Sequence, residues 1–221
     1  MEKALEGEFD FKYFDRGRWW YSEWEGHQRK VMTVQYWYGL YEIQWGYNYD
    51  FIPSWNQREK FDWHRTEKAF CLHVKDSWRG HVEDNTESIS GLGKNNILYR
   101  NPRRCPKYRY ELPENATNLN FALEFMEGVV KRNIPFMKEW FGRVKTLEDV
   151  LSALDRQIET EGTSSTWYWD AFYVKAFLYA KMREMDAAIA MMQKRFPYGE
   201  IPKKVLEKLY QTAEESGLDI R

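Results

Sequence analysis

The fold is decided by one stretch, residues 41–49, which reads Tyr-Glu-Ile-Gln-Trp-Gly-Tyr-Asn-Tyr. Its large apolar side chains fall at every second position, and Glu42, Gln44 and Asn48 fall between them. A period of two is that of a β-strand, because successive side chains point to opposite faces of a sheet. The stretch therefore predicts a strand with one buried, aromatic face and one face toward water.

Neighbouring stretches predict further strands. Residues 9–14, 18–24, 30–37 and 69–74 are rich in aromatic or alternating apolar side chains. The stretches are separated by short turns such as Glu25-Gly26-His27, where glycine accepts the positive φ that a tight turn requires. Short turns join adjacent antiparallel strands, so we expect an antiparallel sheet of about four to six strands between residues 9 and 78.

The second half of the chain has a helical pattern. One amphipathic helix is predicted to start near Thr117 and to be interrupted by Pro135. Thr146-Leu-Glu-Asp149 has the form of a capping box that opens the next helix. Residues 167–182 are apolar around nearly the whole girth of a helix, which predicts a central, buried helix. Pro202 is placed to open the last helix.

Together these patterns predict an α+β fold, in which an N-terminal antiparallel sheet is packed against a C-terminal group of helices. We expect a sheet part at residues 1–80, an irregular connector at 81–116 and a helical part at 117–221, sharing one core. The connector is predicted because its first half carries acidic residues, Ser, Asn and Gly with few large apolar side chains.

Composition and charge exclude several classes of protein. The chain has 221 residues and a formal net charge of −1, so no global positive field draws it to DNA or to an anionic membrane. The aromatic content of 18% excludes a disordered chain. No run approaches the roughly 20 apolar residues that span a bilayer, and the N-terminus does not have the form of a signal peptide. With two cysteines only, we expect a cytoplasmic protein with reduced thiols.

Histidine and cysteine offer few candidates for chemistry. Cys71 and His73 would share a face of the predicted strand 69–74 and could begin a metal site, but the sequence offers no second pair of ligands. We therefore predict no metal and no cofactor. An enzymatic alternative would gather Asp62, His64 and Glu67 in one cleft, although their spacing identifies no reaction.

Residues 99–110 form the one segment whose charge departs from the neutral whole. Arginines and tyrosines alternate in it without an intervening acid, as in proteins that hold phosphates and stack bases of single strands. The candidate binding residues are Arg100, Arg103, Arg104 and Tyr108. Three acidic residues precede the segment and could pair with it instead: Glu83, Asp84 and Glu87.

The aromatic residues of the predicted sheet have two interpretations. Trp19, Trp37, Tyr41 and Trp45 could line a binding face, because Tyr and Trp anchor many protein interfaces. The more usual place for such residues is the core between the sheet and the helices. The 11 tryptophans, however, exceed what a core requires and leave room for a surface that binds another protein.

Four short segments carry a family resemblance. They are Tyr-Glu-Ile-Gln-Trp-Gly at 41–46, Phe-Ile-Pro at 51–53, Asn-Ile-Pro-Phe-Met at 133–137 and Thr-Leu-Glu-Asp at 146–149. In this order they resemble bacterial proteins grouped as a domain of unknown function, over residues 10–160. The resemblance implies a strand-rich part followed by helices and brings no activity. Small α+β proteins of this kind are sometimes encoded beside toxins as immunity partners.

The leading hypothesis is therefore a cytoplasmic, non-catalytic binding protein, immunity-like or regulatory, whose partner is another protein. A nucleic-acid-associated protein that uses residues 99–110 is the first alternative. An enzyme with a site around Asp62, His64 and Glu67 is the second.

Overall fold

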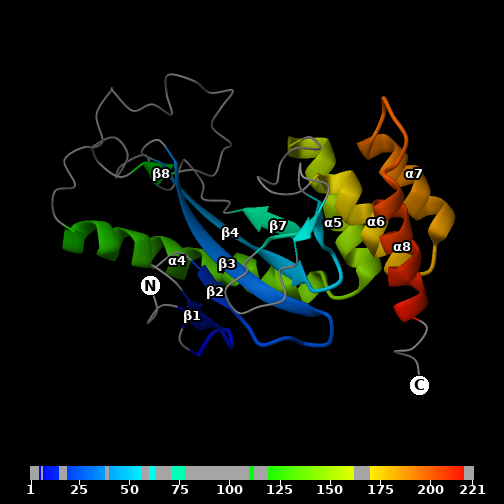
Figure 1. The fold of residues 1–221 in the computed structure, drawn as a ribbon. Helices are drawn as coiled ribbons and strands as arrows, with labels where there is room; N and C mark the ends of the chain where they lie inside the picture. The colour runs from blue at the N-terminus through cyan, green and yellow to red at the C-terminus, as the bar shows by residue number, and fades with distance from the viewer. Residues whose placement is uncertain are drawn as a thin grey trace. The chain divides into compact units, whose positions relative to one another are not determined.

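A computed structural model gives the fold of the chain (Figure 1). It describes residues 5, 7–14, 19–37, 40–55, 60–62, 71–77, 110–111, 119–161 and 170–216. The chain divides into two compact units. The first unit comprises Met1–Glu23, Lys30–Gly46 and Asp76–Gly142, and the second comprises Trp24–Arg29, Tyr47–Lys75 and Arg143–Arg221. The division into parts at 1–80, 81–116 and 117–221 stays a prediction, and most of 81–116 lies outside the described residues.

A six-stranded sheet forms the β part of the fold, with strand order β1-β2-β3-β4-β7 and with β8 also paired to β4 (Figure 1). The strands are β1 (Lys12–Phe14), β2 (Trp19–Tyr21), β3 (Gln28–Trp37), β4 (Leu40–Tyr49), β7 (Val74–Ser77) and β8 (Tyr110–Glu111). The pairs β1–β2, β2–β3 and β4–β8 are antiparallel. Two further short strands, β5 (Ser54–Trp55) and β6 (Phe61–Asp62), form a separate antiparallel pair.

Five helices follow in the described part of the chain. They are α4 (Leu119–Arg143), α5 (Leu147–Glu161), α6 (Ala171–Lys181), α7 (Met185–Arg195) and α8 (Lys203–Glu215). A sheet followed by helices confirms the predicted α+β class. No helix among the described residues is long and apolar enough to cross a membrane.

The break predicted at Pro135 was wrong, because α4 runs through it without interruption. A proline has no N–H and cannot donate the helical hydrogen bond to the carbonyl one turn earlier. Pro135 and Lys131, one turn before it, are both exposed, so this side of α4 faces water. A proline on the solvent side of a long helix therefore costs much less than one facing the core.

The core of the first unit includes the inner face of α4. Val130, Ile134, Met137 and Phe141 recur at helical spacing and are all buried. The ring of Phe141 meets that of Phe9 edge to face, with 5.9 Å between the centroids. This edge-to-face geometry is the arrangement that aromatic quadrupoles favour.

Strand β4 is buried on both faces, which contradicts the wet face predicted for it. Trp45 on one face is fully buried, but Gln44 and Asn48 on the other are also at most 3% exposed. Both polar atoms of the Asn48 amide are buried and have no hydrogen-bond partner among the residues that the structure describes. The alternation did identify the strand, but polar residue type alone does not show that a face is exposed.

The second unit is organised around α6, which contacts α5, α7 and α8 (Figure 1). The predicted central helix is thereby confirmed for residues 171–181: Val174, Phe177 and Leu178 are fully buried. The hydroxyl of Tyr173 donates a hydrogen bond of 2.8 Å to the carbonyl of Pro53, and that of Tyr47 donates one of 2.9 Å to the carbonyl of Val144. These bonds attach the chain around the end of β4 to the helices of the same unit.

The N-terminus of α5 is capped as the sequence predicts. The amide of Asp149 donates to the Thr146 hydroxyl at 3.2 Å, and the Asp149 carboxylate accepts from the Thr146 amide at 3.0 Å. These reciprocal bonds confirm the predicted capping box of α5. At the start of α6, the carboxylate of Asp170 accepts from the amides of Phe172 and Tyr173 in the same way.

Candidate functional site

The aromatic residues proposed from the sequence lie on three strands of the sheet. Trp19 is half-buried on β2, and Trp45 on β4 has an exposure of 0%. The backbones of Trp37 and Tyr41 lie in β3 and β4, and the structure does not describe the side chains of these two residues. Trp45 is therefore a core residue with no surface to offer to a partner.

The other predicted binding and catalytic residues fall largely outside the described residues. This applies to Arg100, Arg103, Arg104 and Tyr108 of the basic segment, and also to His64 and Glu67 of the enzymatic alternative. The backbone of Asp62 lies in β6. Both alternatives therefore stay predictions.

Cys71 and His73 do not share a strand face, because strand β7 begins only at Val74. This corrects the predicted strand at 69–74, of which the structure describes residues 71–74. Both side chains are buried, and His73 Nδ1 accepts a hydrogen bond of 2.8 Å from the amide of Tyr49. An accepting Nδ1 marks a neutral imidazole that carries its proton on Nε2. His73 thus acts as a structural acceptor, and among the described residues no cluster of His, Cys, Asp and Glu could hold a metal.

Three buried tyrosines have raised pKa values. Burial, and secondarily the negative charge of Glu25, raises the pKa of Tyr47 to about 12. Burial also raises the pKa of Tyr49 and that of Tyr173 well above the usual value. All three therefore stay protonated at neutral pH, and Tyr47 and Tyr173 use their protons as structural donors.

The sequence analysis did not predict an ion pair that lies at the edge of the core of the second unit. Lys175 of α6, with 7% of its side chain exposed, pairs with Asp155 of α5. The signal was present, since Lys175 is the one charged residue inside the apolar run 171–180. A buried ammonium group needs such a partner, because removing a charge from water is costly.

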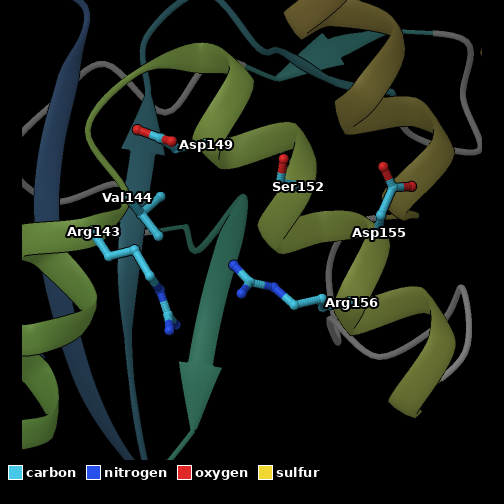
Figure 2. A pocket seen from close by; sticks show the side chains of 6 residues that line it. All are labelled: Arg143, Val144, Asp149, Ser152, Asp155 and Arg156. Atoms are coloured by element: carbon cyan, nitrogen blue, oxygen red, sulfur yellow. The ribbon is translucent and has the colours of Figure 1, made fainter.

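An open surface pocket of about 440 Å³ lies beside α5, and all its lining residues belong to the second unit (Figure 2). Arg143 at the end of α4, Val144 in the connection and Asp149, Ser152, Asp155 and Arg156 of α5 line it. Positions 149, 152 and 156 recur at helical spacing, so one face of α5 forms one wall. Figure 2 shows the guanidinium groups of Arg143 and Arg156 extending toward one another from the two helices.

The turn between α7 and α8 forms the second candidate, which we name the basic turn and define as residues 194–204. Pro197 and Gly199 follow the end of α7, and Pro202 precedes the first residue of α8. Tyr198 between them is fully exposed, at 102%. The exposed basic residues of the turn are Lys194, Arg195, Lys203 and Lys204.

Three of these cations are held by neighbouring groups. Lys203 lies 3.7 Å from the carboxylate of Glu207, one turn further along α8. Arg195 lies 3.6 Å from the carboxylate of Asp170, and its guanidinium lies 5.4 Å from the ring centroid of Phe196. Lys194 lies 5.6 Å from the ring centroid of Phe172. Such contacts restrict long side chains and lower the entropy that binding would otherwise cost.

Comparison with known proteins brings no relative. No protein family, no curated protein and no solved structure is detectably similar to this chain. The resemblance to bacterial proteins of unknown function therefore stays a prediction, and the function must be argued from the residues themselves.

Proposed function

We propose that this chain is a non-catalytic, cytoplasmic binding protein that recognises an acidic surface of another protein through its basic turn. The observation that carries the proposal is the complete exposure of Tyr198 inside a turn of net positive charge. An acidic protein surface could bury this exposed ring and could also pair with the cationic side chains around it.

The charge of the basic turn departs from that of the chain. Residues 194–204 contain four basic side chains and the acidic Glu200, a net charge of +3 that the paired carboxylates of Asp170 and Glu207 reduce to +1, whereas the chain as a whole carries −1. A local positive patch attracts an acidic partner and accelerates its association, and it also repels basic surfaces. Charge complementarity therefore supports an acidic occupant.

Tyr198 has the properties of an interface anchor. Tyrosine and arginine are enriched among the residues that contribute most to binding energy, and burying an aromatic ring removes about 150–250 Å² from water. A tyrosine at the centre of a contact costs about 2 kcal/mol or more when truncated, which is about thirtyfold in Kd. The turn thus offers an anchor with a cationic rim.

A crosslinking experiment identifies the partner. A photoreactive phenylalanine analogue replaces Tyr198 in cells that express the chain, and a matched sample carries it at Gln193, exposed one turn earlier in α7. We expect a protein adduct at position 198 that is absent at 193, and mass spectrometry should identify a protein with an acidic face. Equal adducts at the two positions would refute the proposal, and an adduct with nucleic acid would replace it by the nucleic-acid alternative.

Affinity measurements with the purified partner then test the anchor. We expect Tyr198→Ala to weaken binding at least tenfold and added salt to weaken the wild-type complex. Tyr210→Ala is the matched control, because Tyr210 is also an exposed tyrosine but lies on α8 outside the basic turn. A similar loss for both variants would contradict the assigned role of the turn.

A further inference from the structure

Tyr198 differs from the other tyrosines whose side chains the structure describes. Its side chain is fully exposed, whereas Tyr210 is 47% exposed and the remaining described tyrosines are buried or half-buried. A second enzyme can therefore reach the phenol oxygen of Tyr198 without any movement of the core.

The backbone around Tyr198 is held by few hydrogen bonds. Residues 196–202 form neither helix nor strand, and residues 197–200 are all exposed. Within the part of the chain that the structure describes, the amides of residues 198–201 donate a single hydrogen bond, from Gly199 to the carbonyl of Phe196 at 3.5 Å. A segment with so few hydrogen bonds and no buried side chain opens locally at a low cost in free energy. It can therefore adapt to the cleft of a modifying enzyme.

Tyr210 provides the comparison within the same unit. It lies in the middle of α8, so helical hydrogen bonds fix the backbone on both sides of it. An enzyme that must fit the residues flanking a tyrosine into its cleft would have to unwind part of α8 to use Tyr210. Exposure and backbone freedom therefore coincide at Tyr198 and not at Tyr210.

The charge of the basic turn is small enough for one phosphate to reverse it. The net charge of +3 falls to +1 when the paired carboxylates of Asp170 and Glu207 are counted. A phosphorylated tyrosine carries a charge of about −1.5 to −2 at pH 7. Phosphorylation of Tyr198 would therefore change the sign of the charge that a partner meets at this turn.

We propose that Tyr198 is a phosphorylation site and that its phosphate prevents the basic turn from binding an acidic partner. The second part rests on the function proposed above, whereas the modification itself does not. The phenol oxygen of Tyr198 forms a bond to the γ-phosphorus of ATP while the bond from that phosphorus to ADP breaks, and the phenol proton passes to a carboxylate of the kinase. Like charges that face each other across an interface repel, so the phosphate opposes the acidic surface that the unmodified turn attracts.

Phosphorylation of the full chain in vitro tests the modification site. The chain is incubated with magnesium, ATP and the catalytic domain of a tyrosine kinase of broad specificity, and peptide mass spectrometry follows each position over time. We expect Tyr198 to be modified at least tenfold faster than Tyr210, and Tyr210→Phe to leave the rate at Tyr198 unchanged. Equal rates at the two positions would overturn the proposal, as would the absence of phosphate at Tyr198.

The chain isolated from its own cells gives a second readout. With phosphatases inhibited during isolation, we expect a fraction of the chain to carry phosphate on the peptide that contains Tyr198. A chain without phosphate at this position in every growth phase sampled would contradict the assigned modification.

Binding of an acidic probe tests the effect of the phosphate. The probe is a short polyglutamate peptide with a fluorescent label, and its anisotropy is measured with the chain before and after phosphorylation. We expect phosphorylation to weaken binding tenfold or more. Tyr198→Phe treated with the same kinase is the matched control, and its affinity should stay within threefold of the untreated variant. Circular dichroism confirms that the fold is the same in all samples.

The outcomes distinguish this regulation from the function on which it rests. If the unmodified chain does not bind the peptide, both the proposed function and its regulation by phosphate are overturned. If the unmodified and phosphorylated chains bind the peptide equally well, only the regulation is overturned.

Discussion

Tyr173→Phe tests how the second unit is held together. Tyr173 of α6 is 4% exposed, and its hydroxyl donates to the carbonyl of Pro53, 120 positions earlier in the chain, at 2.8 Å. The substitution removes a single oxygen atom and leaves the packing of the ring intact. It therefore isolates the contribution of one hydrogen bond between a helix and the segment after β4.

The magnitude follows from the burial of both groups. A hydrogen bond of this kind contributes about 1 kcal/mol, and the carbonyl left buried without a donor costs about 1–3 kcal/mol, while the lost hydroxyl no longer has to be desolvated. We expect the free energy of unfolding to fall by about 1–2 kcal/mol. For a chain of this length, each kcal/mol corresponds to about 2–4 °C in Tm.

The assay is urea unfolding followed by circular dichroism and by tryptophan fluorescence. Two probes are needed because the chain has two compact units, and coincident transitions justify a two-state fit. Tyr179→Phe is the matched control on the same helix, since the Tyr179 hydroxyl has no hydrogen bond to a described residue. We expect the control to lie within about 0.5 kcal/mol of the wild type. If Tyr173→Phe also lies within that margin, the hydrogen bond does not hold the unit together.

Further outcomes follow from the caps, the backbone and the tyrosines. Thr146→Ala should lower the free energy of unfolding by about 1 kcal/mol in the same urea assay, because it removes the cap of α5. Arg183→Gly should raise the free energy of unfolding by up to about 1 kcal/mol, because Arg183 follows α6 with a φ of 66°, which glycine adopts without strain. The Tm measured by calorimetry checks the direction of this change. Tyr47 holds its proton more tightly in the folded chain, so stability is fully present below pH 10 and is lost as the pH rises toward 12; in Tyr47→Phe this part of the alkaline slope should be absent. The carboxylate of Asp149 has a lowered pKa, so its contribution is present above about pH 4 and is lost on acidification; Asp149→Asn should reduce the acid dependence of helix content.

Local patterns predicted the elements of this fold well. The alternation in residues 41–49 identifies β4, and the Thr146–Asp149 signature identifies the start of α5, because both depend on neighbours in the sequence. The predictions were wrong where packing between residues distant in the sequence determines whether a position is buried or exposed. Pro135 is tolerated because it faces water, and Asn48 is buried because its face of the sheet is covered.

The sequence predicted the candidate sites less well than it predicted the helices and strands. Arg143 and Arg156 lie on two different helices, and no spacing rule indicates that they face a common pocket. The end of α7 at Pro197 and Gly199 was predictable, but the full exposure of Tyr198 depends on how the two flanking helices pack. Trp45 was a candidate by residue type, and its place in the core follows from tertiary packing.

The order of the segments along the chain has a consequence for how the protein can be dissected. Each unit takes its residues from three separate stretches, and a stretch of one lies between two stretches of the other. No single cut of the gene therefore separates the two units: a fragment ending at Gly142 holds all of the first unit, but it also holds residues 24–29 and 47–75 of the second. During translation the residues of the first unit are complete only when α4 has been synthesised, and those of the second only when α8 has been synthesised.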